Sequence, residues 1–234
     1  MAKPLLPDGL WSLIEPLIPP HPPQPKGGRP FLDDHQGQAP WDISEPQPEF
    51  VRLAESGAIE GTVLDVGCGT GENALYLAAR GHDVWGIDFV PKAIELARDK
   101  AIQRGLGVHF QVGDALKLEV LGRTFDTVID CGLFRTFNDE ERSLYVRSLA
   151  GAVRPGGAAY LLCFCDQEPP GEGPRCVAQP EIRAAFHDCW EVEGIREARF
   201  KTADFAGAAQ FCPGGPKAWL VTVRRTPQAC PNTP

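Results

Sequence analysis

Apolar runs of strand length alternate with longer amphipathic stretches from residue 50 onward. The run 158–165 is almost entirely apolar, which is typical of a central strand covered on both faces. Strands that alternate with helices at this spacing predict an α/β fold, a mostly parallel, doubly wound sheet with helices on both faces. The predicted strands are 63–67, 83–88, 108–114, 124–132, 158–165, 192–200 and 218–223.

Local signals mark where the predicted helices begin and end. Gly81 ends the first of them, because glycine readily adopts the backbone conformation that stops a helix. Asn138 followed by Glu141 forms a capping-box pattern, and the run RPGG at 154–157 breaks the helix that this pattern starts. Helices are predicted to begin at Glu72, Pro91, Asn138 and Glu181.

The N-terminal part differs in composition from the rest, because twelve of the 23 prolines lie before residue 49. A short helix is expected over 8–18, with Asp8 as its N-cap, and an extended Pro-rich linker over 19–30. We therefore predict a Pro-rich extension at 1–39, a globular domain at 40–225 and a C-terminal tail at 226–234.

Composition and charge narrow the class of protein. Of 234 residues, 43% are hydrophobic and 23% are charged, which is ordinary for a globular protein. The net charge of −8 argues against a general nucleic-acid binder, which would present a basic face. No apolar stretch is long enough to span a bilayer and there is no export signal, so we expect a cytoplasmic protein without a membrane partner. The sequence does not indicate an oligomeric state.

The cysteines are numerous but carry no metal-binding spacing. They form no CxxC pair and no zinc-type pattern with histidine, so we predict no metal site and mostly buried thiols. Cys163 and Cys165 lie two positions apart in a predicted strand and therefore point to the same face. If they converge with Cys131, a site for methylation of arsenite or another metalloid becomes an alternative. The eight cysteines are Cys68, Cys131, Cys163, Cys165, Cys176, Cys189, Cys212 and Cys230.

The stretch 63–88 has the order strand, glycine loop, helix, strand and acid, which is the architecture of a nucleotide-cofactor pocket. Gly67, Gly69 and Gly71 allow a ligand to approach the backbone and the helix N-terminus closely. Asp88 ends the second strand, where an acid can bind ribose hydroxyls. These features fit both a dinucleotide and S-adenosylmethionine.

Charge distinguishes the two cofactors. Asp65 lies inside the first strand, and Glu72 adds a negative charge at the helix N-terminus. Carboxylates repel a pyrophosphate but attract the ammonium and sulfonium of S-adenosylmethionine. The GxGxG spacing also differs from the GxGxxG of NAD-binding folds, and no YxxxK motif is present. An NAD-dependent oxidoreductase is therefore the less favoured reading. Asp114 and Ala115 follow the third strand, where an adenine amino group could be bound.

The segments LDVGCGTG, GIDFVPKAIELAR, GDAL, FDTVIDCGLF and VRPGG resemble successive motifs of class I S-adenosylmethionine-dependent methyltransferases. The resemblance covers about residues 40–225. It implies a Rossmann-like, seven-stranded sheet in the order 3-2-1-4-5-7-6 with the last strand antiparallel. By motif position, Asp65, Gly67 and Gly69 would hold the methionine end and Asp130 would close its pocket. Asp88 would bind the ribose, Phe89 would lie along the adenine, and Asp114 with Ala115 would contact its edge; Cys68 and Gly71 complete the predicted loop.

Two further resemblances concern the N-terminal part. PWDISEPQPEF at 40–50 is similar to the entry segment of small-molecule methyltransferases acting on thiols, halides, thiopurines, benzoquinones or aromatic heterocycles. It implies that Trp41 lies over the cofactor and substrate cleft, where its indole could attract a sulfonium. Ser44 stands where such segments usually carry glycine. Residues 1–35 resemble the N-terminus of an insertion-sequence transposase, and no transposase catalytic domain follows.

The loop 131–137 follows the fourth strand, at the edge of the sheet where an acceptor should bind. Related proteins often carry histidine at the position of Arg135, and arginine cannot act as a base. We therefore predict that Arg135 steers an anionic acceptor and that Phe134 and Phe137 also contact it. Tyr145 and Phe164 could complete an apolar pocket with them and Trp41.

The predicted function is transfer of a methyl group from S-adenosylmethionine, with S-adenosylhomocysteine as product. The acceptor is the sulfur, nitrogen or oxygen nucleophile of a small molecule, aromatic or thiol in type, and the reaction is an in-line displacement. A non-catalytic cofactor-binding protein that uses its Pro-rich arm to recruit a partner is an alternative.

Overall fold

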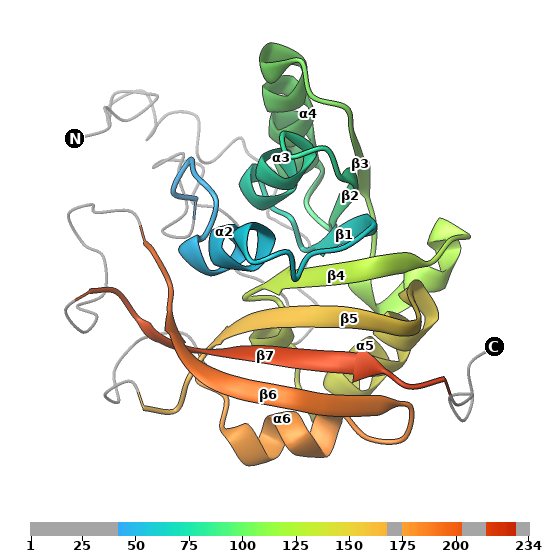
Figure 1. Ribbon diagram of the computed structural model, residues 1–234, viewed down its shortest axis with the longest axis vertical. Coiled ribbons are helices and arrows are strands. Elements are labelled where there is room, and N and C mark those ends of the chain that lie inside the picture. Colours follow the sequence, from blue (N-terminus) through green and yellow to red (C-terminus); the bar gives the residue numbers. More distant parts are fainter. Residues whose placement is uncertain (1–41, 168–174, 203–213, 228–234) are drawn as a thin grey trace, which may run out of the picture.

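The computed structural model describes residues 42–167, 175–202 and 214–227. Its centre is a seven-stranded sheet with the order β3-β2-β1-β4-β5-β7-β6, in which β7 alone is antiparallel to its neighbours (Figure 1). This confirms the predicted sheet and its order. The strands are β1 (Thr62–Val66), β2 (Asp83–Asp88), β3 (Val108–Val112), β4 (Phe125–Cys131), β5 (Val153–Phe164), β6 (Trp190–Arg199) and β7 (Lys217–Arg225).

Helices cover both faces of the sheet. On one face, α2 (Pro48–Glu55), α3 (Glu72–Ala78) and α4 (Pro91–Arg104) pack over one core cluster. The other face carries the 3₁₀ segments η2 (Ala115–Leu121) and η3 (Phe134–Thr136), with α5 (Asp139–Ala152) and α6 (Gln179–Ala185). β5 shows why both cores form: Leu161 and Cys163 point into the α5 face, whereas Leu162 and Phe164 point into the α3 face. The prediction of a central strand covered on both sides is confirmed.

The predicted helix boundaries are largely confirmed. Asn138 accepts a hydrogen bond from the backbone of Glu141 at 2.9 Å, and Glu141 accepts one from the backbone of Asn138 at 3.0 Å. Pro91 is the first residue of α4. The run 154–157 does follow the end of α5, but it belongs to β5, which begins five residues earlier than predicted. An irregular register between β4 and β5 accommodates the two glycines of this run.

Two short elements escaped the sequence pattern. α2 begins at Pro48, directly after the Pro-rich region, and its N-cap residue Gln47 makes no side-chain capping hydrogen bond, so no capping signal marks its start. η2 follows Asp114, whose carboxylate accepts a hydrogen bond from the Leu116 backbone at 2.9 Å. The predicted helix at 8–18, the linker at 19–30 and Trp41 lie outside the described residues. The domain boundaries at 39/40 and 225/226 stay predictions.

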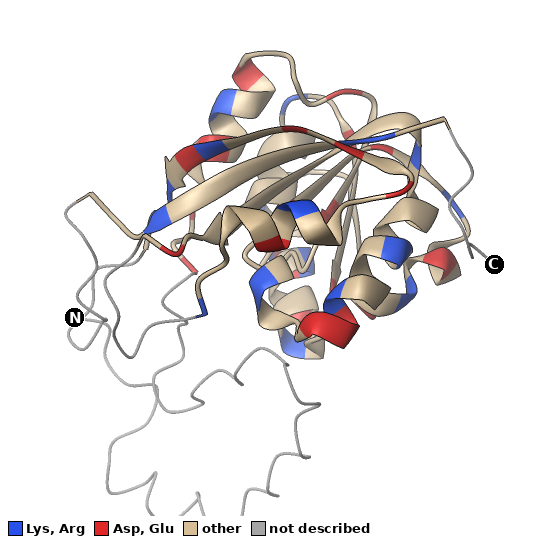
Figure 2. Ribbon diagram, turned by 90° about the horizontal axis from the view of Figure 1, so that it is seen from below, with Lys and Arg blue, Asp and Glu red and all other residues tan. Residues whose placement is uncertain are grey.

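Basic and acidic residues are interspersed over the helices seen in Figure 2. None of the helices in the described part of the chain combines the length and apolar character needed to cross a membrane.

Candidate functional site

Three acids lie at the carboxyl ends of neighbouring parallel strands. Asp65 on β1, Asp88 on β2 and Asp130 on β4 are 0%, 5% and 1% exposed. Val66 pairs with Asp130 and Asp65 with Gly86, so β1 and its two neighbours bring these carboxylates to one edge of the sheet. A parallel sheet binds its ligands at this edge. The structure therefore brings together the three acids that the sequence singled out.

The glycine loop joins β1 to α3 and needs glycine for two physical reasons. Gly67, Gly69 and Gly71 have φ of 69°, 54° and 87°, which is the left-handed region that side chains disfavour. Space is also lacking: a Cβ on Gly71 would lie 2.7 Å from Phe110 Cζ, and one on Gly67 would lie 3.1 Å from Leu133 Cδ2. The loop is thus packed closely on both sides.

Asp88 fixes the glycine loop by hydrogen bonds to the backbone. Its Oδ2 accepts a hydrogen bond from the Gly69 backbone at 2.8 Å, and its Oδ1 accepts one from the Val90 backbone at 2.9 Å. The next residue, Phe89, is 67% exposed, so its ring is available to a ligand. The structure shows that Asp88 orders the loop; its contact with a ribose stays a prediction.

Cys68, Asp114 and Ala115 occupy supporting positions. The backbone N–H of Cys68 donates to the Ile87 carbonyl at 2.8 Å, which ties the loop to β2, and its thiol is buried beside Gly86. Asp114 caps η2 and Ala115 is the first residue of that segment. A contact of this corner with an adenine edge stays a prediction.

Glu72 does not present the uncompensated negative charge that we expected. Lys100 and Arg104 of α4 pair with its carboxylate at 2.9 Å and 2.8 Å. Burial alone would raise the pKa of Glu72, but hydrogen bonds and charges from Arg104 and Lys100 outweigh it and hold the pKa below 4.5. Its contribution to cofactor choice was therefore interpreted wrongly, since the pair of cations neutralises it; Asp65 and Asp130 carry that argument.

The pKa of Glu72 predicts a pH effect on stability. A carboxylate with a folded pKa below its ordinary value stabilises the fold above that value, and the stabilisation is lost as pH falls through the folded pKa. In Glu72→Gln, the free energy of unfolding should therefore be lower than in wild type near neutral pH, and the difference should shrink below pH 4.5. Urea unfolding at several pH values measures this.

Glu55→Gln is the matched control, because Glu55 forms an exposed pair with Arg80 at 3.6 Å. Exposed pairs contribute little, so its stability should follow wild type across the same pH range. A pH-independent difference between wild type and Glu72→Gln would contradict the prediction.

The carboxylate of Asp130 organises the start of the acceptor loop. Oδ1 accepts a hydrogen bond from the Leu133 backbone at 2.7 Å, and Oδ2 accepts one from the Phe134 backbone at 3.0 Å. The Tyr145 hydroxyl donates to Oδ2 at 2.7 Å. Burial, together with the charges of Asp130 and Asp65, raises the pKa of Tyr145 well above its ordinary value. Tyr145 therefore stays a neutral donor.

The aromatic residues of the predicted acceptor pocket divide between the two faces of the sheet. Phe134, 1% exposed, stacks on Phe186 with ring centroids 5.7 Å apart, and Phe137 packs on Tyr145 at 4.7 Å; both pairs lie on the α5 face. Phe164 lies on the opposite face. The expectation of a single pocket is therefore wrong: consecutive strand residues alternate in direction, and η3 turns Phe134 into the core.

Arg135 and Phe164 do meet. The Arg135 guanidinium lies 4.7 Å from the Phe164 ring centroid, and that ring stacks on Phe200 at 4.4 Å with an interplanar angle of 22°. A Cβ on Gly132 would lie 3.6 Å from Phe200 Cζ and 3.9 Å from Arg135 Nε. Arg135, Phe164 and Phe200 therefore form one group. We call Arg135, Phe164 and Phe200 the aromatic–guanidinium group.

Cys131, Cys163 and Cys165 do not gather into one site. Cys163 and Cys165 point into the α5 face, as predicted, whereas Cys131 packs against the opposite face. Burial raises the pKa of the Cys163 thiol well above its ordinary value, which keeps it protonated. Among the described residues, no group of three or more His, Cys, Asp or Glu side chains is placed to hold a metal ion. The arrangement that metalloid methylation requires is absent from this set.

The entry segment, residues 42–47, connects the two halves of the sheet. Asp42 accepts a hydrogen bond from Thr70 of the glycine loop at 3.0 Å. The Gln47 backbone donates to Asn73 of α3 at 2.9 Å, and its side-chain amide exchanges two hydrogen bonds of 2.9 Å with the Lys201 backbone. Ser44 adopts a φ of 55°, which explains why glycine is usual there.

Sequence reasoning missed three contributors to this region. Phe200 was predicted only as a strand residue, and Tyr145 only as a pocket aromatic. Lys100 belonged to the amphipathic pattern of α4, and its spacing of four residues from Arg104 was the one signal that could have identified a paired site.

The donor set fits S-adenosylmethionine. Asp65 and Asp130 are buried carboxylates suited to a cationic methionine end, and Asp88 stands where ribose hydroxyls could donate. The close-packed glycines leave bare backbone beside these acids. A pyrophosphate at the same place would lie beside two buried negative charges.

Comparisons with known proteins agree with this geometry. A family model described as a methyltransferase domain matches residues 63–157, which run from β1 into β5. The 2-heptyl-1-hydroxyquinolin-4(1H)-one methyltransferase of Mycobacteroides abscessus is 39% identical over 197 residues, covering 79% of this chain and 85% of that protein.

Solved structures show the same fold. One described as "Conversion of a Disulfide Bond into a Thioacetal Group during Echinomycin Biosynthesis" is 37% identical, has a TM-score of 0.74 and covers 82% of this chain and 86% of that chain. Magnesium protoporphyrin IX methyltransferase from Synechocystis PCC 6803 with bound S-adenosylmethionine is 22% identical, with a TM-score of 0.56 over 76% of each chain.

Proposed function

The chain belongs to the class I S-adenosylmethionine-dependent methyltransferases, and from this premise we propose that it methylates an ionised oxygen on a small, flat heteroaromatic acceptor. A thiolate is the second candidate for the accepting atom. In either case Arg135 would steer the anion and no protein base would be required.

The aromatic–guanidinium group is the observation that carries this proposal. Its two stacked rings, Phe164 and Phe200, are 8% and 5% exposed and form an apolar wall, and Arg135 supplies a positive charge that is permanent at physiological pH. Arg135 follows β4 and Phe164 ends β5, so the group lies at the carboxyl edge of the sheet, as the acids do. A planar anion is the ligand that satisfies both features.

The relative from Mycobacteroides abscessus supports the proposed acceptor class. Its name describes a flat bicyclic heteroaromatic acceptor with a hydroxyl on the ring nitrogen. Such an acidic hydroxyl loses its proton without a strong base. An arginine in the acceptor loop suits this chemistry, since it can attract the oxyanion but cannot remove a proton.

The protein's own tasks in the reaction are alignment and charge. S-adenosylmethionine supplies a methyl group already activated by its sulfonium, which becomes a neutral thioether when the oxygen–methyl bond forms. Asp65 and Asp130 would hold the cationic end of the cofactor, and Asp88 the ribose. Leu133, at the start of the acceptor loop, packs on Gly67 and so sets the position of this loop relative to the glycine loop.

The thiolate alternative rests on the structure with 37% identity, whose description concerns conversion of a disulfide bond into a thioacetal. Sulfur chemistry of that kind would also place an anionic nucleophile before the cofactor. Arg135 would attract a thiolate as it attracts an oxyanion.

Transfer of a radiolabelled methyl group decides between the candidates. The purified full chain is incubated with labelled S-adenosylmethionine and 2-heptyl-1-hydroxyquinolin-4(1H)-one, its 1-deoxy analogue or thiophenol. We expect label on the first compound and none on the analogue, which lacks the accepting oxygen. Label on thiophenol alone would establish the thiolate alternative. Binding of S-adenosylhomocysteine with no label on any acceptor would contradict both and favour a non-catalytic binder.

Replacing Arg135 tests its part in the proposal. In Arg135→Ala, kcat/KM for the hydroxyquinolinone should fall by about 10–100-fold, because a charge-assisted contact to the anion is lost. The loss should appear mainly in KM, while the affinity for S-adenosylhomocysteine stays near wild type. Initial rates and titration calorimetry measure the two.

Arg154→Ala is the matched control. Arg154 pairs with Asp126 at the start of β5, the opposite edge of the sheet, and is half exposed. Its kinetics should stay within about twofold of wild type. Unchanged kinetics in Arg135→Ala would exclude a role in acceptor binding.

A further inference from the structure

Tyr145 has an interaction that packing alone does not require. It lies on α5, is 0% exposed, and its hydroxyl is directed at the Asp130 carboxylate 2.7 Å away. Its ring already packs on Phe137, with centroids 4.7 Å apart. A phenylalanine would preserve this ring contact. The contribution of the hydroxyl is its hydrogen bond to the carboxylate.

The carboxylate of Asp130 passes this constraint to the acceptor loop. It accepts hydrogen bonds from the backbone N–H groups of Leu133 and Phe134, at 2.7 Å and 3.0 Å. The Thr136 backbone in turn donates to the Leu133 carbonyl at 2.8 Å, which closes η3. Tyr145 thus fixes the carboxylate that accepts the hydrogen bonds of the first turn of this loop.

The same turn contacts the cofactor side of the site. Leu133 is the residue that a Cβ on Gly67 would meet first, at 3.1–3.3 Å from three of its atoms. Any rotation of the Asp130 carboxylate would move Leu133 relative to the glycine loop. Alignment of the methyl group with the accepting atom depends on the position of Leu133 against the glycine loop. A displacement of about 1 Å is enough to reduce a rate 100-fold.

We propose that Tyr145 is a positioning residue for methyl transfer, which acts through Asp130 to hold Leu133, at the start of the acceptor loop, against the glycine loop. This inference rests on the proposed function for its kinetic consequence only. The hydroxyl also supplies a neutral donor to the buried Asp130 carboxylate, and the charge of Asp65 acts on the same hydroxyl.

Tyr145→Phe tests the inference, with Tyr160→Phe as the matched control. Tyr160 on β5 also loses one hydrogen-bonding hydroxyl, which donates to the Ala58 carbonyl at 3.0 Å on the opposite face. Two measurements need no acceptor: hydrogen exchange of the Leu133 and Phe134 amides, and calorimetric affinity for S-adenosylhomocysteine. Methyl transfer to 2-heptyl-1-hydroxyquinolin-4(1H)-one is the third.

In Tyr145→Phe, exchange at Leu133 and Phe134 should rise about tenfold or more, because their acceptor is no longer fixed. Affinity for S-adenosylhomocysteine should fall about threefold or more, through the loosened methionine end. Tyr160→Phe should change neither quantity by that much. Smaller changes in Tyr145→Phe, or equal changes in both variants, would overturn the inference.

Kinetics separate this inference from the proposed acceptor. If the hydroxyquinolinone is methylated, kcat in Tyr145→Phe should fall by about tenfold or more, with a smaller change in KM for the acceptor. If it is not methylated by wild type, the proposed acceptor fails while exchange and affinity still decide the role of Tyr145.

Asp130→Asn provides a second route if Tyr145→Phe does not fold. An amide offers one oxygen in place of two, so it cannot accept from Tyr145 and both backbone groups in the same geometry. Its exchange at Leu133 and Phe134 should also rise about tenfold. Where both single variants fold, the double variant should resemble Asp130→Asn alone, since the tyrosine acts through that carboxylate. Additive effects would show that Tyr145 acts independently and would overturn the inference.

Discussion

Asp88→Ala should weaken the binding of S-adenosylhomocysteine by about 100-fold, which corresponds to a loss of about 3 kcal/mol. The carboxylate holds the Gly69 and Val90 backbone groups, at 2.8 Å and 2.9 Å, and these order the glycine loop and the start of α4. Its removal releases the loop and deletes the acceptor proposed for the ribose. Titration calorimetry at constant pH and salt measures the affinity.

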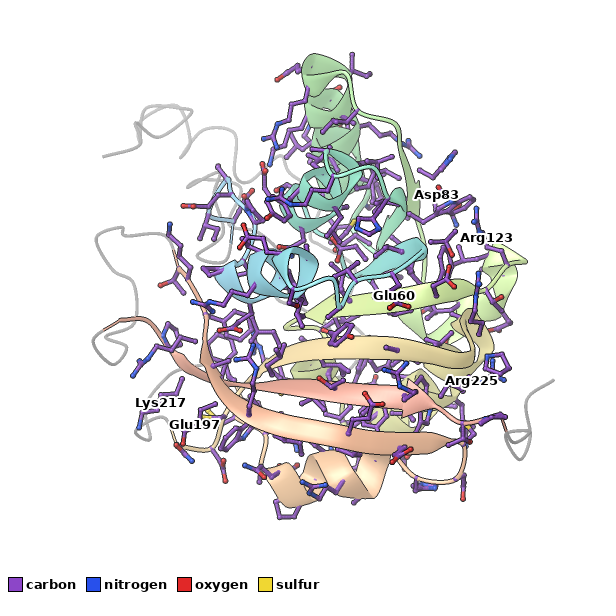
Figure 3. All side chains as sticks on the ribbon, viewed as in Figure 1. Glu60, Asp83, Arg123, Glu197, Lys217 and Arg225 are labelled. Atoms are coloured by element: carbon purple, nitrogen blue, oxygen red, sulfur yellow. The ribbon has the colours of Figure 1, made fainter. Side chains whose placement is uncertain are left out.

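Asp83→Ala is the control from the same strand. Asp83 begins β2 and Asp88 ends it, so the two acids lie at opposite edges of the sheet. Figure 3 shows Asp83 beside Arg123, whose guanidinium donates to it at 3.2 Å. This is an exposed pair, and its loss should change the affinity by less than about twofold. Equal losses in the two variants would show that Asp88 has no special part in binding.

Gly71→Ala should destabilise the protein by about 2–5 kcal/mol, the sum of a left-handed backbone penalty and overpacking. The added Cβ would lie 2.7 Å from Phe110 Cζ and 3.0 Å from Ala97 Cβ. Both neighbours are buried in the α3-side core and cannot move away freely. Urea unfolding monitored by tryptophan fluorescence gives the free energy, and cofactor binding should be lost with the loop geometry.

Gly105→Ala separates the two causes. Gly105 ends α4 with a φ of 63°, and an added Cβ would meet nothing within 4 Å. It should therefore lose only the conformational part, about 1 kcal/mol. If Gly71→Ala cost no more than Gly105→Ala, the close packing of the glycine loop would have no energetic consequence.

The fold was predictable because local and periodic signals in this chain agree. Gly81, Pro91 and Asn138 mark helix ends by their own backbone or side-chain chemistry. These signals involve only residues close in the sequence, so no tertiary contact is needed to recognise them. The apolar run 158–165 needed no tertiary information to be identified as a central strand. α2 was missed because no capping residue marks its start, and η2 because a short 3₁₀ segment does not show the α-helical period.

The candidate site was predictable where one motif contains it and unpredictable where distant segments meet. Asp65, Asp88 and Asp130 could be placed, since each lies at or one residue before the carboxyl end of its strand and parallel strands end at the same edge. Glu72 lies far along the chain from Lys100 and Arg104, with which it pairs, and the spacing of those two cations does not identify their partner. The division of Phe134 and Phe164 between opposite faces depends on where η3 turns the chain.

The hydrogen bonds from Gln47 have a consequence for the newly made protein. Its amide pairs with the Lys201 backbone, 154 positions further along the chain. While the ribosome is still extending the polypeptide, the amide has no such partner, even after β1, α3 and β2 have emerged and begun to fold. Gln47 can therefore bond to both Asn73 and Lys201 only after most of the chain has been translated. A nascent chain that stalls before Lys201 has the glycine loop, but its entry segment lacks the hydrogen bonds to Lys201.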